Sequence, residues 1–139
     1  MKSTFICSYS RTAIGAFQGS LRNTSATTLG GAVIKSVVEK ASINKKNIDE
    51  VIMGNVLSAN LGQAPARQAC LNADLDNKIE CMTINKVCGS GLKSIMLADQ
   101  SIKTENSDIV LAGGMENMSM APFYIQDARK GMIFGNNKF

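Results

Sequence analysis

Residues 84–95 read INKVCGSGLKSI, and they join an apolar run to a helical pattern. The stretch places Cys88 directly before Gly89, Ser90 and Gly91, at the point where the helix is expected to begin. Small residues beside a thiol allow a substrate or another backbone to approach closely, because no side chain stands in the way. Packing alone rarely requires such a sequence, so the stretch indicates a strand-to-helix turn that carries a candidate nucleophile.

Strands and helices are expected to alternate on either side of this stretch. Short β-branched or apolar runs predict strands at residues 4–9, 50–57, 81–85 and 108–114. Helical periodicity predicts a helix from Leu29 to Ala41 capped by Thr27 or Thr28, a short helix opened by Pro65, and a helix from Cys88 to about Thr104. Such alternation predicts an α/β fold with a layered, mostly parallel sheet.

The helix expected after Cys88 differs from the first one in its apolar pattern. Its apolar residues are scattered around the helix instead of gathered in one stripe: Leu92, Ile95, Met96, Leu97, Ala98 and Ile102. A helix of this kind is expected to be buried on most sides. Beyond Gly114 the sequence is rich in Met, Asn and Gly and predicts no regular element.

Composition narrows the class of function. The chain has 139 residues, of which 45% are hydrophobic and 19% charged, as in an ordinary globular domain. Its formal charge of +4 is spread along the chain without a basic run or clustered aromatic residues, which argues against nucleic-acid binding. No apolar run reaches the roughly 18 residues that span a bilayer, and no secretory signal is evident. A cytoplasmic protein that binds neither membrane nor nucleic acid is expected.

The cysteines are expected to be reduced thiols, because they show no C-x-x-C spacing. Cys7, Cys70 and Cys81 lack glycine neighbours and are interpreted as core residues. Cys88 could also be a small buried residue. However, unpaired N–H groups and the helix dipole at a helix start favour a thiolate, and the same groups could hold an oxyanion. Cys88 is therefore the candidate nucleophile.

Histidine is absent from the chain. Because zinc sites in proteins usually include histidine or a larger group of cysteines, no metal site is expected. A cysteine nucleophile usually borrows a histidine as its proton partner. Any such partner is expected to lie outside this chain.

Three further groups of residues are interpreted as structural. The pairs Gly30-Gly31 and Gly113-Gly114 match no phosphate-loop pattern and are assigned to tight turns and close packing. Arg11 and Arg67 could meet phosphates but are left out of the site. The methionines after the last strand predict an adaptable apolar surface: Met115, Met118 and Met120.

Four segments resemble the thiolase family, which comprises acetyl-CoA acetyltransferases and 3-ketoacyl-CoA thiolases. They are RTAIGAFQGSL at 11–21, GNVLSANLGQAPARQA at 54–69, INKVCGSGLKSI at 84–95 and AGGMENMSMAP at 112–122. The resemblance implies a thiolase-like N-terminal α/β domain at residues 1–114, incomplete because four of the five strands of that half are expected, and it implies that the family's second half is absent. Residues 115–139 would then begin the loop domain that covers CoA and the partner subunit.

The resemblance also implies an activity and its substrates. The cysteine that matches Cys88 takes the acyl group from acetyl-CoA or another acyl-CoA as a thioester, and no cofactor beyond CoA takes part. Claisen condensation or thiolysis follows, in fatty acid metabolism and in a homo-oligomeric enzyme. The second cysteine, two histidines and an asparagine motif belong to the C-terminal half, so this chain alone is expected to complete no turnover.

Two alternatives remain open. A ketosynthase-like condensing enzyme also begins a buried helix with its nucleophilic cysteine, but RTAIG and GGMEN favour a thiolase. A non-catalytic thiolase remnant, or a dimerising interaction module, would keep the strand at 81–85 and lose the enzyme. The absence of histidine favours this second alternative.

Overall fold

Three parallel strands form the centre of the protein, which we describe from a computed structural model for residues 2–125. The strands are β1 (Glu50–Gly54), β2 (Glu80–Ile84) and β3 (Val110–Gly114), and their spatial order is β2-β1-β3. Gly54 pairs with Ile84 on one side and with Gly114 on the other. Because the strands end in register, the loops that follow them gather at one edge of the sheet.

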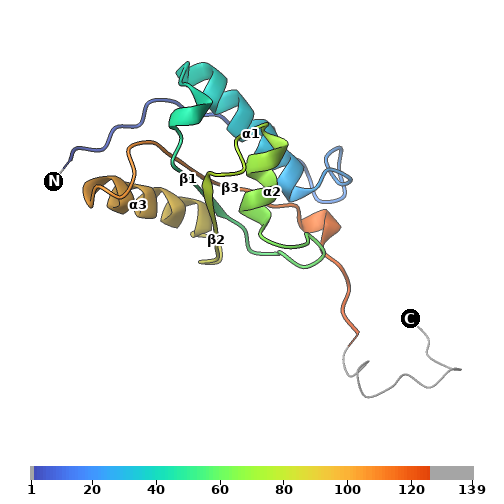
Figure 1. Cartoon of the computed structure of the whole chain (residues 1–139). Helices are drawn as coiled ribbons and strands as arrows, with labels where there is room; N and C mark the ends of the chain where they lie inside the picture. The colour runs from blue at the N-terminus through green and yellow to red at the C-terminus, as the bar shows by residue number, and fades with distance from the viewer. Residues whose placement is uncertain (1, 126–139) are drawn as a thin grey trace, which may run out of the picture.

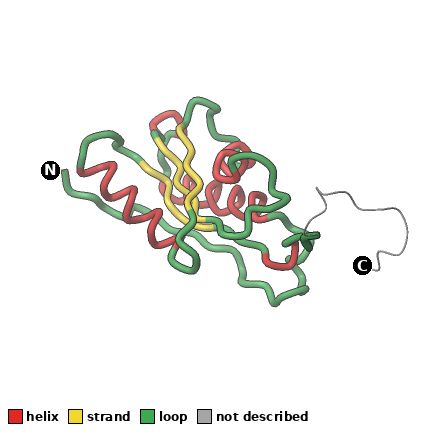
Figure 2. Tube along the Cα trace, turned by 90° about the horizontal axis from the view of Figure 1, so that it is seen from below, coloured by secondary structure: helices red, strands yellow, loops and turns green. Residues whose placement is uncertain are grey.

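Helices cover both faces of this sheet (Figure 1). Helices α1 (Ala26–Ala41) and α2 (Pro65–Asn72) lie on one face, and α3 (Ser90–Lys103) lies on the other. Seen from below, the strands separate α3 from the other two helices (Figure 2). The predicted layered α/β fold is therefore confirmed, with helices in the connections between parallel strands.

Local signals in the sequence explain the starts of the first two helices. Helix α1 begins three residues earlier than expected, because the Ser25 hydroxyl accepts a hydrogen bond from the Thr28 N–H at 3.1 Å. The cap is thus Ser25 and not Thr27 or Thr28. Pro65 is the first residue of α2, as predicted, and there its missing N–H costs no intrahelical bond.

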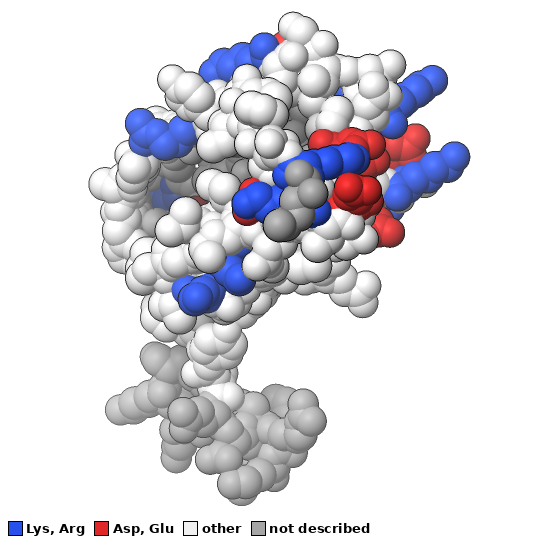
Figure 3. Space-filling model, turned by 90° about the vertical axis from the view of Figure 1, so that its left-hand side faces the viewer, with Lys and Arg blue, Asp and Glu red and all other residues white. Residues whose placement is uncertain are grey.

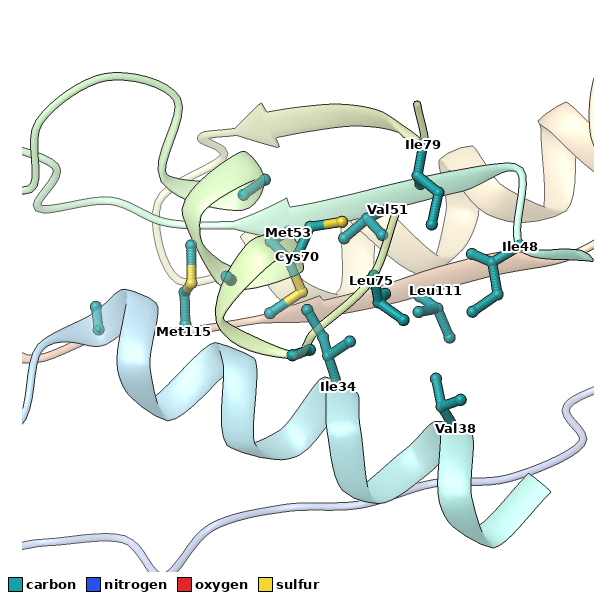
Figure 4. Packing of buried hydrophobic residues seen from close by; sticks show 14 residues of the cluster. Ile34, Val38, Ile48, Val51, Met53, Cys70, Leu75, Ile79, Leu111 and Met115 are labelled. Carbon is teal, nitrogen blue, oxygen red and sulfur yellow. The ribbon is translucent and has the colours of Figure 1, made fainter. Parts of the chain in front are cut away.

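The main hydrophobic core lies between the sheet and helices α1 and α2 (Figure 4). Ile34 and Val38 of α1 point towards the sheet, where Val51 and Met53 project from β1. Successive residues of a strand face opposite sides, so Val51 and Met53, which are two positions apart, belong to one face. The cluster is completed by other buried residues that include Ile48, Cys70, Leu75, Ile79, Leu111 and Met115.

Helix α3 contacts the sheet through small residues, and the prediction that it is buried on most sides is wrong. Its buried residues are Ser90, Ser94 and Ala98. Leu92, Ile95 and Met96 are 66%, 43% and 48% exposed. The sheet covers only one side of the helix, and no other part of residues 2–125 covers these three side chains.

The strand expected at residues 4–9 does not form. Residues 2–16 carry no regular secondary structure, and Phe5, Ile6 and Tyr9 are between 79% and 84% exposed. Lys2 pairs with Asp108, just before β3, and the Ser10 hydroxyl lies 2.9 Å from that of Ser36 in α1, so the segment passes from the start of β3 to α1 without pairing with a strand. β-Branched and aromatic residues favour an extended chain, but a strand also needs a hydrogen-bonded neighbour.

The segment after β3 contains one short element that the sequence did not predict. Residues Met118–Met120 form a 3₁₀ helix, and the Asn117 side chain accepts a hydrogen bond from the Ser119 N–H at 2.9 Å. The remainder of the expected loop-domain segment, from residue 126 onwards, lies outside the described residues. Within residues 2–125, no helix combines the length and the hydrophobicity needed to cross a bilayer.

Candidate active site

The carboxyl ends of the three strands meet at one edge of the sheet, and polar side chains leave the strands there. Asn55 follows β1, Asn85 follows β2, and Glu116 stands two residues after β3. In open parallel sheets this edge is where ligands bind, because the loops that leave neighbouring strands converge on it. The turn with Cys88 begins at the same edge.

Glu116 fixes the loop that leaves β1. Its carboxylate accepts hydrogen bonds from the N–H groups of Val56 and Leu57 at 2.9 and 3.1 Å. It also accepts one from the Asn55 side-chain amide at 3.0 Å, and that amide donates to the Met115 carbonyl at 3.1 Å. Hydrogen bonds to a charged acceptor are stronger than neutral ones, so the segment after β3 holds the loop after β1 in place.

Cys88 lies in a turn between β2 and α3, and its side chain is exposed. The helix begins at Ser90, so the expectation that Cys88 itself starts the helix is off by two residues. The Gly89 N–H donates to the Lys86 carbonyl at 3.0 Å, and the Ser90 N–H donates to the Val87 carbonyl at 3.1 Å. The thiol therefore stands on a hydrogen-bonded turn, open to an incoming molecule.

The turn leaves several backbone donors near the thiol. Within residues 2–125, no carbonyl or side chain accepts a hydrogen bond from the N–H groups of Cys88, Gly91 or Leu92. The first N–H groups of a helix have no intrahelical partner, and they carry the positive end of the helix dipole. This arrangement suits a group that develops negative charge beside the Cys88 sulfur.

The small residues after Cys88 allow the backbones to approach closely. A methyl group on Gly54 would lie 2.6 Å from the Ser90 carbonyl carbon and 2.8 Å from the Gly91 nitrogen. A methyl group on Gly114 would lie 3.2 Å from the Gly91 Cα. The first turn of α3 can therefore pack directly against the ends of β1 and β3 only because these positions are glycine.

The other cysteines occupy three different environments. Cys70 is fully buried, as predicted, and burial raises the pKa of its thiol to about 12. Cys81 is half-buried against the core cluster. Cys7 is exposed, so its assignment to the core is wrong. The segment that contains Cys7 forms no strand and has no sheet to pack against.

Arg67 and the pair Gly30-Gly31 make contacts that fit the structural role assigned to them, whereas Arg11 is exposed. The Arg67 guanidinium donates to the Ile79 carbonyl at 2.7 Å and also to the Asn77 carbonyl. A methyl group would lie 2.6 Å from the Met115 sulfur if added to Gly30, and 2.6 Å from the Asn72 Cβ if added to Gly31. Close packing therefore explains this glycine pair.

The methionines divide between core and surface. Met115 is 7% exposed and belongs to the core cluster, whereas Met118 is 65% exposed.

On the face seen in Figure 3, acidic and basic side chains stand side by side, and no continuous basic surface appears there.

Sequence reasoning missed the residues that hold the turn and its neighbouring loop. Asn55, Asn85 and Glu116 were not singled out, although each follows a strand that the sequence predicted. Asn85 could have been noticed, because an asparagine two residues before a turn position often accepts a hydrogen bond from the backbone there. Glu116 offers no comparable local signal, because its partners are about 60 residues away in the sequence.

Comparison with known protein families gives a match over almost the whole chain. The family model described as thiolase, N-terminal domain, matches residues 4–139. An acetyl-CoA acetyltransferase of Escherichia coli (strain K12) is 52% identical over 139 residues, which cover 99% of this chain and 35% of the relative. Acetyl-CoA acetyltransferase 2 of Arabidopsis thaliana is 50% identical over 132 residues, which cover 95% and 33%.

A solved structure agrees with these sequence matches. The Acat5 thiolase from Ascaris suum, in complex with coenzyme A, superimposes with a TM-score of 0.86 at 41% identity. The superposition covers 88% of this chain and 32% of that one. The chain thus spans about a third of the length of the relatives that it matches, 35% in the case of the Escherichia coli protein.

Proposed function

This chain belongs to the thiolase family, and on that premise we propose that it serves thiolase-type acyl transfer with Cys88 as the acyl-accepting nucleophile. The observation that carries the proposal is the place of Cys88. Its exposed thiol stands on the turn before α3, at the edge of the sheet where the loops converge. Cys88 also lies within the segment INKVCGSGLKSI that resembles the family.

The reaction suits a thiol in this position. The Cys88 sulfur bonds to the carbonyl carbon of an acyl thioester, the bond from that carbon to the leaving sulfur breaks, and the leaving group takes up a proton. The negative charge on the carbonyl oxygen can be held by the N–H groups of Cys88, Gly91 and Leu92. The product is another thioester, still reactive towards a carbanion in Claisen condensation or towards CoA in thiolysis.

Acetyl-CoA and other acyl-CoA thioesters are the proposed substrates. Two relatives bear the name acetyl-CoA acetyltransferase, and the solved Ascaris suum thiolase holds coenzyme A. We propose that no cofactor beyond CoA takes part. A role in fatty acid metabolism and a cytoplasmic location stay predictions from the sequence.

The second half-reaction needs groups that this chain lacks. A base must remove a proton next to a carbonyl, and the chain contains no histidine. We propose that residues 1–114 form the N-terminal α/β domain and that residues 115–139 begin a loop domain. The 139 residues alone are then expected to accept an acyl group on Cys88 slowly, without turnover.

A homo-oligomer is the proposed assembly of the complete enzyme. β2 lies at the edge of the sheet and pairs only with β1 within residues 2–125. An open strand edge is a template for pairing with a second copy. If β2 pairs in this way, light scattering of the chain will show a mass that grows with concentration, and a monomer at all concentrations would count against the pairing.

Mass spectrometry after exposure to acetyl-CoA tests the role of Cys88. We expect one acetyl group on a fraction of the wild-type chains, on Cys88 itself, and none on Cys88→Ser. Cys7→Ser is the matched control, because Cys7 is also exposed but lies far from α3 in the sequence, and it should be acetylated like the wild type. Acetylation that follows Cys7 instead, or none at all, would favour the non-catalytic module.

A coupled thiolysis assay tests the second half-reaction. Loss of general acid–base help removes a factor of about 10² to 10⁴ in rate, so no thiolysis should be detectable with the 139-residue chain. Multiple turnovers that depend on Cys88 would show that the chain needs no groups from a second half.

A further inference from the structure

We propose that Asn85 and Ser90 are positioning residues for Cys88. Together they hold Val87 in the left-handed conformation, and this conformation decides where the turn presents the neighbouring thiol. The inference deepens the proposed function and rests on it, because the placement of the thiol matters only if Cys88 reacts.

Val87 has a backbone conformation that its side chain disfavours. Its φ is 49°, in the left-handed region that β-branched residues rarely occupy. Its side chain is 65% exposed, so packing does not force this conformation. Hydrogen bonds to the Val87 backbone must therefore supply the restraint.

Two side chains make those hydrogen bonds, one from each side of Val87. The Asn85 side-chain carbonyl accepts a hydrogen bond from the Val87 N–H at 2.9 Å. The Ser90 hydroxyl donates to the Val87 carbonyl at 2.6 Å and accepts from the Lys86 N–H at 2.8 Å. Both polar backbone groups of Val87 are thus held by these side chains, and the Val87 carbonyl also accepts the backbone hydrogen bond from the Ser90 N–H at 3.1 Å.

Both side chains are themselves anchored to the sheet edge. Ser90 is 4% exposed, and it lies so close to Gly54 that a methyl group added to Gly54 would come within 2.7 Å of the Ser90 Cβ. The Ser90 side chain therefore has little room to move. The Asn85 amide donates to the Val56 carbonyl at 3.4 Å, and the Val56 N–H is held by Glu116 at 2.9 Å. The turn with Cys88 is therefore fixed relative to the loops after β1 and β3.

A merely structural role for the same bonds makes a different prediction. If Asn85 and Ser90 only stabilise the start of α3, their loss should matter whatever residue stands at position 87. If they hold Val87 in the left-handed conformation, their loss should matter little where that conformation is preferred anyway. Asparagine tolerates the left-handed region much better than valine does. Val87→Asn is therefore the background that separates the two roles.

The experiment compares two reactions of the thiol in the 139-residue chain. Acetyl transfer from the thioester S-acetyl-N-acetylcysteamine needs an oriented sulfur. In it, the Cys88 sulfur bonds to the acetyl carbon, the bond to the cysteamine sulfur breaks, and the released thiolate takes the proton that Cys88 gave to solvent. Alkylation by iodoacetamide makes a weaker demand on orientation. Cys7, which is also exposed, serves as the internal reference for alkylation, and mass spectrometry follows both reactions.

Asn85→Ala and Ser90→Ala should each slow the acetylation of Cys88 about fivefold, a ratio that corresponds to one hydrogen bond of ordinary strength. Alkylation should change by less than about twofold, because it does not depend on the bonds that hold Val87. In the Val87→Asn background, the loss of acetylation should shrink to less than about twofold. Equal losses in both backgrounds, or a parallel fall in alkylation, would overturn the inference.

A second measurement keeps the inference separate from the proposed function. If the wild-type chain is not acetylated at all, the proposed function fails. Nuclear magnetic resonance shifts of labelled Val87 then decide the inference alone. They should indicate a left-handed residue in the wild type and an extended one in Asn85→Ala and Ser90→Ala. A left-handed Val87 in both variants would show that these side chains do not hold it.

Discussion

The two faces of the sheet are covered by helices that pack in opposite ways. Towards α1 and α2 the protein buries apolar side chains such as Ile34 and Val51. Towards α3 it buries Ser90, Ser94 and Ala98, while Leu92 and Ile95 point outwards. The first face is stabilised by the removal of apolar surface from water. The second face depends on the close approach of the α3 backbone to the sheet and on hydrogen bonds. These fix the position of α3 against the sheet more than they add to the free energy of unfolding.

Ser94 illustrates how the α3 face is held. Its side chain is fully buried, and its hydroxyl lies 2.6 Å from the Gly91 carbonyl and 2.7 Å from the Gly113 carbonyl. A buried hydroxyl is tolerated when it is hydrogen-bonded, and here the bond ties the helix to β3. The start of α3 is therefore set at a defined depth against the sheet edge, beside the turn with Cys88.

The largest contrast should come from truncating an isoleucine on each side. Ile34→Ala removes a side chain that is 3% exposed and should lower the free energy of unfolding by about 3 to 4 kcal/mol. Ile95→Ala removes one that is 43% exposed and should change it by less than about 1 kcal/mol. Urea unfolding measures both. Similar losses would mean that the outer side of α3 is buried in solution.

A smaller contrast should come from two glycines near the start of α3. Gly54→Ala places a methyl group against the backbone of Ser90 and should cost about 2 to 3 kcal/mol. Gly89→Ala is the control, because its methyl group would lie 3.4 Å from the Lys86 carbonyl oxygen and its φ of −90° suits alanine. Thermal unfolding compares them. A tolerated Gly54→Ala would show that α3 can move away from the sheet.

The outer side of α3 should affect association more than stability. Replacing Leu92, Ile95 and Met96 by glutamine keeps a good helix former at each position and should change the free energy of unfolding by less than about 1 kcal/mol. Aggregation should decrease, because a contiguous apolar patch is removed. Light scattering at rising concentration measures this. The same substitution at three exposed residues of the N-terminal segment, Phe5, Ile6 and Tyr9, tests whether the effect belongs to α3.

The smallest effects should come from one surface ion pair on each face. Lys35 of α1 lies 2.9 Å from Asp74, and its hydrogen bond lowers the pKa of that carboxyl. Within α3, Lys103 lies 2.9 Å from Asp99 and likewise lowers its pKa. Each pair therefore adds stability at neutral pH that is lost as the pH falls below about 4.

Asp74→Asn and Asp99→Asn should each reduce this acid-dependent loss of stability. Both pairs are exposed and screened by solvent, so the reductions should be small. Urea unfolding at neutral and acid pH measures them. A variant whose acid-dependent loss equals that of the wild type would show that its pair contributes nothing.

The sequence predicted the parts of the fold that depend on nearby residues. The alternation of apolar runs located β1, β2 and β3 to within a few residues, and Pro65 marked the first residue of α2. The resemblance to thiolases was confirmed by the family match over residues 4–139. The role of Cys88 stays a prediction, although the structure leaves its thiol exposed on the expected turn between a strand and a helix.

Apart from helix starts that are off by two or three residues, the errors concern what lies beside a segment in space. An extended, aromatic-rich stretch at residues 4–9 becomes a strand only if another strand pairs with it, and none does within residues 2–125. The apolar residues of α3 predicted burial, but the sheet contacts only the side with Ser90 and Ser94. The sequence of a segment indicates which secondary structure it prefers, but not which other segments will lie beside it.

Residue order by itself determined the alternation of strands and helices and the cysteine in its small-residue turn, because both depend on residues within a few positions of each other. Tertiary structure alone decided how that turn is fixed against the neighbouring loops. Gly54 and Ser90 meet from different elements, and Glu116 binds the loop after β1 across about 60 residues of sequence. Such contacts arise only when parallel strands end in register and bring their loops to one edge.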